Sequence, residues 1–188
     1  RPGVPVGFLS KGFCRHHQDI LTISEAITAA IPFLGDRVVA ISGPSHAEEV
    51  SKNYHTCLCV AAKSREARAV FTRLLNNDFL ECRETEDIRG VELGGTLKNP
   101  AAIAAGMISA FDNCGDNLAG ALMAEALKEI IRIGRGMGAR EETLIDICGC
   151  GDLVATSLSG HSRNRRFGID IARQLLSTGR TIGFLDRV

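Results

Sequence analysis

The sequence lacks an excess of charge of either sign. Its 188 residues contain 22 lysines and arginines and 22 aspartates and glutamates, so the formal net charge at pH 7 is zero. We therefore expect no overall basic surface and no nucleic-acid partner. The chain also has no apolar run as long as a membrane span, and no signal peptide opens it. We expect no membrane span.

Paired cysteine motifs are also missing. Seven cysteines are present, and they include Cys57-x-Cys59 and Cys148-x-Cys150 but no C-x-x-C pair. Most lie in apolar runs, which favours reduced core residues in a cytoplasmic protein over metal binding. His16-His17 has no third ligand at a recognisable spacing, so we interpret it as a surface pair and predict no metal site.

The first 86 residues alternate strand-like and helix-like segments, in a chain whose 45% apolar content is ordinary for a globular protein. Apolar and β-branched runs predict strands at residues 4–9, 38–41, 56–62 and 78–82. Helical spacing and capping residues predict helices at 19–33, at 46–50 after Ser45, and at 64–75 after Ser64. This alternation indicates an α/β layer with a largely parallel sheet.

Strand patterns disappear after about residue 86. Helices are predicted at residues 118–137, 141–148 and 162–176. In the apolar segment 87–111, Pro100 leaves two interpretations. Either Asn99 caps a new helix, or one helix starts near Asp87 and kinks at Pro100. We therefore divide the chain into an α/β part at 1–86 and an all-helical part at 87–188.

A lysine occupies an unusual setting in the segment Gly94-Gly95-Thr96-Leu97-Lys98-Asn99-Pro100. Lys98 precedes a long apolar run, although an unpaired ammonium is costly to bury. One interpretation is a desolvated lysine with a lowered pKa that exchanges protons near neutral pH. The other is a lysine whose stem packs while its head reaches water. This stretch by itself favours the second.

Two further segments carry groups suited to a binding site. Asp152 either caps the helix that follows it or projects with Thr156, one helical turn on, from the same face. Ser162 is a helix cap followed by Arg163, Arg165 and Arg166, and the helix dipole disfavours cations there. A bound anion would remove the conflict, whereas a solvated basic turn is the alternative.

One glycine-rich segment is a poor candidate for a dinucleotide loop. The sequence Gly134-x-Gly136-x-Gly138 follows a predicted helix rather than a strand, so the turn that cradles a pyrophosphate has no strand to start from. We interpret it as a helix end.

Five motifs occur in the order and approximate spacing of the NAD(P)-dependent glycerol-3-phosphate dehydrogenases, and the chain resembles that family over nearly its whole length. The motifs are residues 10–13 (SKGF), 42–50 (SGPSHAEEV), 91–99 (VELGGTLKN), 151–156 (GDLVAT) and 162–164 (SRN). The resemblance implies the carboxyl-terminal part of a Rossmann-like sheet followed by a helical substrate domain, with residues 1–86 as a partial nucleotide-binding domain. It also implies NAD or NADP as cofactor.

The resemblance further implies an activity and a set of site residues. The family interconverts dihydroxyacetone phosphate and sn-glycerol 3-phosphate, a precursor for glycerophospholipid synthesis. Lys98 would donate and accept the proton, with Asp152 beside it. The implied substrate-binding residues are Lys11, Gly43, Ser45, Lys98, Asn99, Asp152, Thr156, Ser162, Arg163 and Asn164. The implied cofactor-binding residues are Lys11, Ala47 and Arg163.

The sequence also departs from the family pattern. The amino-terminal G-x-G-x-x-G loop and the carboxyl-terminal end are absent from these residues, so we expect this stretch alone to be inactive. Pro100 and Cys150 replace residue types that are common in the family. A hydroxy-acid or nucleotide-sugar dehydrogenase remains an alternative, as does a binding or oligomerisation remnant without turnover. A homodimer is left open.

Overall fold

The computed structural model describes residues 3–178. The elements of the first half, in chain order, are β1 (Val6–Phe8), β2 (Phe13–His16), β3 (Asp19–Thr22), α1 (Ile23–Ala30), the 3₁₀ helix η1 (Pro32–Arg37), β4 (Val38–Ser42), α2 (Ala47–Val50), β5 (Thr56–Ala61), α3 (Arg65–Leu75) and β6 (Leu80–Thr85). The second half consists of α4 (Ile88–Ile108), α5 (Asp116–Gly136), α6 (Glu141–Ile145), the π-helical turn η2 (Ile147–Gly151), α7 (Asp152–Leu158) and α8 (Arg163–Ser177).

The α/β class is confirmed, but the sheet is mixed rather than largely parallel. Its strand order is β1-β4-β5-β6, and the β1–β4 and β5–β6 pairs are parallel. The middle pair, β4 with β5, is antiparallel and places Ser42 opposite Cys59. Only the four-residue helix α2 lies between these strands, and so short an element does not carry the chain back to the other end of the sheet, as a parallel partner requires.

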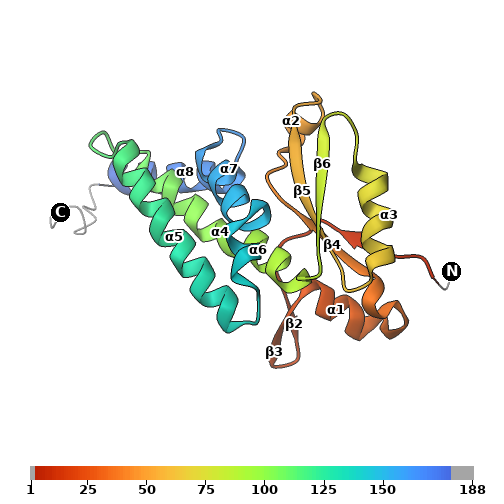
Figure 1. The fold of residues 1–188 in the computed structure, drawn as a ribbon. Coiled ribbons are helices and arrows are strands. Elements are labelled where there is room, and N and C mark those ends of the chain that lie inside the picture. Colours follow the sequence, from red (N-terminus) through yellow and green to blue (C-terminus); the bar gives the residue numbers. More distant parts are fainter. Residues whose placement is uncertain (1–2, 179–188) are drawn as a thin grey trace.

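Alternate residues of the central strands face two different cores. Val39 and Ile41 pack with Phe71 of α3 on one face of the sheet. Ala40 and its neighbours on β5 pack against α4 and η2 on the other face. Figure 1 shows the resulting arrangement, with α3 outside the sheet and α4 running from the sheet into the group of helices α5 to α8.

The predicted helix at 19–33 was too long. Residues 19–22 form β3, which pairs with β2 in an antiparallel hairpin, and α1 begins only at Ile23. Thr22 and Glu25 form a capping box at that start, which ends the strand and fixes the first turn of the helix. The apolar Ile20 that suggested a helix is 69% exposed.

Three other predicted boundaries were wrong. The fourth strand is Leu80–Thr85 rather than 78–82, because the Asn77 side chain accepts bonds from the Phe79 and Leu80 amides and holds a turn there. Ser45 does not cap α2; its hydroxyl donates to the Gly43 carbonyl. The helix predicted at 141–148 ends at Ile145 and is followed by η2.

Helix α4 is the central element of the helical half. It runs from its Asp87 cap to Ile108 with Pro100 inside, so the expectation of one helix across Pro100 is confirmed and that of a new helix capped by Asn99 is wrong. Leu93 on α4 is fully buried among Ile130, Leu144 and Leu153 of α5, α6 and α7. Because four helices and the sheet contact it, α4 fixes the position of every side chain it carries toward the sheet.

The remaining features concern cysteines and membrane contact. All seven cysteines are free; Cys59 and Cys148 are buried and the others are partly exposed. His16 and His17 are exposed at the tip of the β2–β3 hairpin, as a surface pair should be. Among the helices of residues 3–178, none combines the length and apolar character needed to cross a membrane.

Candidate active site

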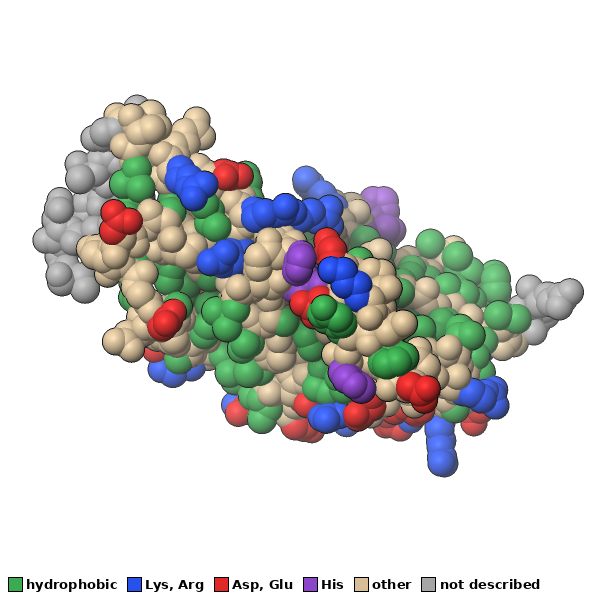
Figure 2. Space-filling model, turned by 90° about the horizontal axis from the view of Figure 1, so that it is seen from above, with side chains coloured by type: hydrophobic (Ala, Val, Ile, Leu, Met, Phe, Trp, Pro, Cys, Tyr) green, Lys and Arg blue, Asp and Glu red, His purple; other side chains and the backbone are tan. Residues whose placement is uncertain are grey.

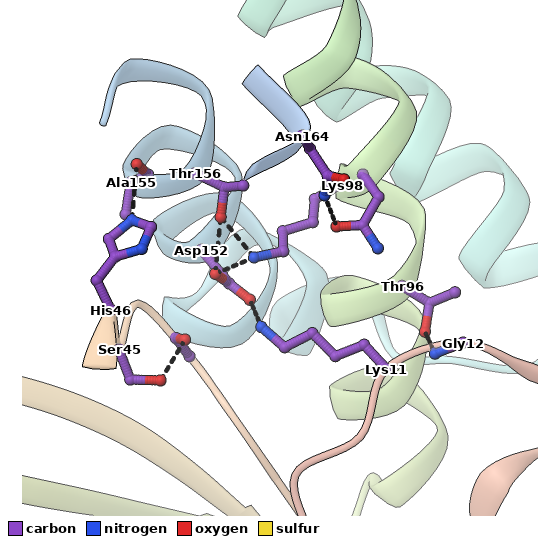
Figure 3. A network of polar contacts seen from close by, with 12 residues as sticks. Lys11, Gly12, Ser45, His46, Thr96, Lys98, Asp152, Ala155, Thr156 and Asn164 are labelled. Carbon is purple, nitrogen blue, oxygen red and sulfur yellow. Dashed lines mark hydrogen bonds and ion pairs between the residues drawn. The ribbon is translucent and has the colours of Figure 1, made fainter. Parts of the chain in front are cut away.

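The site lies where two parallel strands end. Lys11 follows β1 and Gly43 follows β4, and parallel pairing puts both carboxyl ends at one edge of the sheet. Ligands of α/β proteins bind at this kind of edge. Helices α4 and α7 border the same space, and Figure 3 shows the polar side chains that converge there.

Lys98 is buried with one carboxylate and one hydroxyl as partners. Its Nζ lies 2.5 Å from Asp152 Oδ1 and 2.5 Å from Thr156 Oγ1, and Thr156 also donates to Asp152 Oδ1 over 3.2 Å. Lys98 is 5% exposed and Asp152 is 2% exposed. An ammonium has three N–H donors, so one donor of Lys98 remains without an acceptor within the described structure.

Burial lowers the pKa of Lys98 to about 8, from an ordinary lysine value of 10.5. The positive charge of Lys11 acts in the same direction, whereas Asp152 raises the pKa and offsets part of the effect. A lysine with this pKa can exchange protons near neutral pH. This agrees with the interpretation of Lys98 as a desolvated lysine, rather than one whose head reaches water. Arg163 is not among the groups with the largest effects on Lys98.

Lys11 reaches the same carboxylate from the sheet side. Its Nζ lies 2.5 Å from Asp152 Oδ2, and its side chain is 27% exposed. Asp152 therefore bridges two lysines, one deeply buried and one at the border with solvent. Asp152 does not cap α7, because both of its oxygens are turned to the lysines.

Asn99 and Asn164 connect α4 to the start of α8. The Asn164 amide donates to Asn99 Oδ1 over 2.8 Å, and the Ser162 hydroxyl caps α8 by accepting from the Arg165 amide over 3.2 Å. Arg163 is exposed, and no carboxylate within residues 3–178 lies at ion-pair distance from it. The positive helix start thus carries a cation that has no acidic partner in that range.

The segment after β4 lies against α7. The ring of His46 contacts the Ala155 carbonyl at 3.4 Å, and the Ser45 hydroxyl turns back to the Gly43 carbonyl. Ala47 is exposed at the start of α2. His46 brings the predicted Gly43 to Ala47 segment to the helix that carries Asp152 and Thr156. No hydrogen bond within residues 3–178 joins Gly43 or Ser45 to the two lysines.

Positive charge exceeds negative charge around the site. Lys11 and protonated Lys98 share one carboxylate, and Arg163 adds to them. The face seen from above in Figure 2 shows Lys and Arg side chains gathered near histidines. His161, His46 and Arg166 act on Glu48 and help to lower the pKa of its carboxyl, after the larger effect of its own backbone amide. A dianionic ligand fits such surroundings.

The residues present fit only part of a nicotinamide nucleotide. Lys11 follows β1 and supplies a cation, and Ala47 and Arg163 are exposed at the starts of α2 and α8. The 188 residues contain no G-x-G-x-x-G sequence, and Gly134, Gly136 and Gly138 lie at the end of α5 and just beyond it, as interpreted. The described part of the chain therefore offers no strand-linked loop for a pyrophosphate.

Sequence patterns did not reveal all the residues that shape the site. The motifs include Thr96, His46 and Gly94. The spacing of these residues did not predict which groups they contact. A Cβ on Gly94 would lie 2.8 Å from the Cys148 carbonyl oxygen, so the missing side chain lets η2 approach α4. Motif membership was the only available signal.

A buried lysine paired with a carboxylate at the carboxyl edge of an α/β sheet is an arrangement suited to a nicotinamide-dependent dehydrogenase. Two family models match the chain. The one described as "NAD-dependent glycerol-3-phosphate dehydrogenase N-terminus" matches residues 1–68, and the corresponding "C-terminus" matches residues 87–182. The chain belongs to the NAD-dependent glycerol-3-phosphate dehydrogenase family, whose cofactor is NAD or NADP. The resemblance drawn from the motifs is confirmed.

Relatives give the same assignment. A glycerol-3-phosphate dehydrogenase [NAD(P)+] of Clostridium botulinum is 43% identical over 136 residues, which are 72% of this chain and 41% of the relative. A glycerol-3-phosphate dehydrogenase [NAD(P)+] of Deinococcus radiodurans is 40% identical over 80% of this chain and 48% of the relative. The crystal structure of glycerol-3-phosphate dehydrogenase from Coxiella burnetii matches with a TM-score of 0.82 at 30% identity, over 97% of this chain and 56% of that one. The chain thus spans about half the length of its curated relatives.

Proposed function

We propose that the full-length enzyme carrying this chain interconverts dihydroxyacetone phosphate and sn-glycerol 3-phosphate with NADH or NADPH. The observation that carries the proposal is Lys98, buried with a pKa of about 8 and held by Asp152 and Thr156 with one donor unused. A group with that pKa serves as an acid in reduction and as a base in oxidation.

In the reducing direction, Lys98 protonates the carbonyl oxygen of the substrate. When bound, a nicotinamide cofactor would supply a hydride to the carbonyl carbon. The electron pair of the C=O bond moves to oxygen, which takes a proton from Lys98 Nζ and becomes a hydroxyl. Lys11 stabilises negative charge that develops on this oxygen, while Asp152 holds both lysines in place.

The phosphate of the substrate binds at the start of α8. Arg163 has no acidic partner in the described residues, and Asn164 and Asn99 already lie in contact. An anion bound there would accept from the backbone amides of the helix start and pair with the guanidinium. Ser162 keeps its hydroxyl hydrogen for donation, because its oxygen accepts in the cap. We assign Gly43 and Ser45 to the substrate border and Lys11, Ala47 and Arg163 to the cofactor.

The wider role follows the family. We propose a nucleotide-binding domain that includes residues 1–86 and a substrate domain that includes 87–188. We also propose a cytoplasmic location and supply of sn-glycerol 3-phosphate for glycerophospholipid synthesis, with a homodimer as the assembly to test. The alternative of a hydroxy-acid or nucleotide-sugar dehydrogenase is not favoured, since the matching family models are those of glycerol-3-phosphate dehydrogenase.

Kinetics of the full-length enzyme on two substrates test the proposal. Lys98→Ala should lose most turnover on both dihydroxyacetone phosphate and dihydroxyacetone. Arg163→Ala should raise the KM for dihydroxyacetone phosphate about tenfold or more, which corresponds to about 1.4 kcal/mol per tenfold. It should change the KM for dihydroxyacetone much less. Arg166→Ala, exposed on the same helix, is the matched control.

Two results would contradict this assignment. Turnover of Lys98→Ala within a few-fold of wild type would exclude the proton-transfer role. An equal effect of Arg163→Ala on both substrates would show that Arg163 does not recognise the phosphate.

A further inference from the structure

The loop that carries Lys11 is fastened to the helix that carries Lys98. The Gly12 amide, one residue after Lys11, donates to Thr96 Oγ1 over 2.9 Å. Thr96 lies on α4 two residues before Lys98. Figure 3 shows this contact beside the Lys11, Lys98 and Asp152 group. Both lysines of the site therefore take their position from one helix.

The absence of a side chain at Gly95 gives the Lys11 stem its path. A Cβ on Gly95 would lie 3.4 Å from Lys11 Cδ and Cε and 2.6 Å from Ser42 Oγ. The methylene groups of Lys11 thus run along α4 next to Thr96. The Ser42 hydroxyl near Gly95 is buried and has no hydrogen-bond partner among residues 3–178.

Little else restrains the loop. Residues 9–11 are exposed, and a Cβ on Gly12 would meet nothing within 4 Å. Gly12 has a φ of 137°, which glycine adopts without strain. Among the described residues, Lys11 and Gly12 bond to other elements only through Lys11 Nζ, which donates to Asp152, and through the Gly12 amide, which donates to Thr96.

We propose that Thr96 is a positioning residue, whose hydroxyl fixes the Lys11 loop on α4 and so keeps the Lys11 ammonium beside Asp152 and Lys98. Its relevance to catalysis depends on the proposed function, because that function gives the two lysines their roles. The positioning itself can be measured without turnover.

The protonation of Lys98 reports where Lys11 lies. The charged groups that act most strongly on Lys98 are Asp152 of α7 and Lys11 of the loop, and they act in opposite directions. His46 of the α2 segment contacts the Ala155 carbonyl instead, and Arg163 begins α8. If the loop detaches, Lys98 loses a neighbouring cation and keeps its carboxylate, so its pKa rises from about 8 toward the ordinary value.

NMR titration of isotopically labelled lysine side chains in this chain tests the proposal. Thr96→Val keeps the branched shape and removes the acceptor, and it should raise the Lys98 pKa by on the order of 1. Thr96→Ser should restore the wild-type titration. Thr28→Val is the matched control, because the one hydrogen bond of the Thr28 hydroxyl in the described part of the chain goes to the Ser24 carbonyl of its own helix. Thr96→Ala is the second variant should the valine protein not fold.

Lys11→Met supplies the internal standard. Lys11→Met should raise the Lys98 pKa by the whole contribution of the Lys11 charge. Adding Thr96→Val to Lys11→Met should raise the Lys98 pKa no further. An unchanged titration in Thr96→Val and Thr96→Ala, or an equal change in Thr28→Val, would overturn the proposal. An additive effect on the Lys11→Met background would also overturn it, since Thr96 would then act independently of Lys11.

Kinetics separate this proposal from the proposed function. In the full-length enzyme, Thr96→Val should move the pH profile of turnover upward with the Lys98 pKa, and Thr96→Ser should return it. A shifted titration in an enzyme that turns over no dihydroxyacetone phosphate would sustain the positioning role and refute the proposed function.

Discussion

Replacing Lys98 by methionine measures what the burial of its charge costs. Methionine is unbranched and of similar length but has no ammonium, so packing is largely kept. Asp152 keeps a partner in the variant, because Lys11 remains 2.5 Å from its other oxygen. The comparison therefore isolates the titration of a side chain that is 5% exposed and has a pKa of about 8.

The sign of the effect follows from proton binding. Between about pH 8 and pH 10.5 the folded chain has released the Lys98 proton while the unfolded chain still holds it. The free energy of unfolding of the wild type therefore rises with pH through this window, relative to Lys98→Met. The total rise is about 3 kcal/mol, at about 1.4 kcal/mol for each pH unit. Below pH 8 the difference between the two proteins should be constant.

Urea unfolding from pH 6.5 to 10.5 in the presence of a reductant provides the measurement. Other groups that titrate in this range, such as Cys82 with its pKa raised to about 11, are common to both proteins and cancel in the difference. Lys63→Met is the matched control, since Lys63 is exposed and its charge stays hydrated. A difference curve for Lys98→Met that is as flat as that for Lys63→Met would refute the reasoning.

Three further predictions concern anchors of the fold and cofactor binding. Glu92 is buried, which raises the pKa of its carboxyl, and it accepts from the Ser24 amide and hydroxyl. The protein should therefore lose stability as the pH rises through that pKa and the buried carboxyl ionises. In urea unfolding near pH 7, Glu92→Gln should be more stable than the wild type and Glu92→Ala less stable. A glutamine variant less stable than the wild type would contradict this. Asp87 accepts from the Gly90 and Arg140 amides, so thermal melts should show Asp87→Ala less stable by about 2 kcal/mol, with Asp87→Asn losing less. Equal losses would mean that the contact which the asparagine oxygen still accepts contributes nothing. Calorimetric titration of this chain with NADH or NADPH should give weak or no binding, and micromolar affinity would show that the glycine-loop argument is wrong.

Local sequence signals predicted many elements but not how they pair. Ser64 and Ser162 cap α3 and α8 as expected, because an N-cap needs only a hydroxyl and the amides of its own first turn. The antiparallel pairing of β4 with β5 and the β2–β3 hairpin depend on partners elsewhere in the chain. Helical spacing at residues 19–33 could not exclude a strand, since the pattern ignores those partners.

The candidate site divides in the same way. The order and spacing of the motifs by themselves determined the family and named Lys11, Lys98, Asp152 and Thr156. They could do so because proteins that share one chemistry and one fold carry its residues in the same order along their sequences. Only the tertiary structure decided that one carboxylate bridges two lysines from segments more than fifty residues apart, and that burial among packed helices lowers the Lys98 pKa. It also assigned the Thr96 contact, for which the sequence held no signal. Distances and desolvation depend on how α4, α7 and the sheet edge pack together, and that packing is a property of the whole chain.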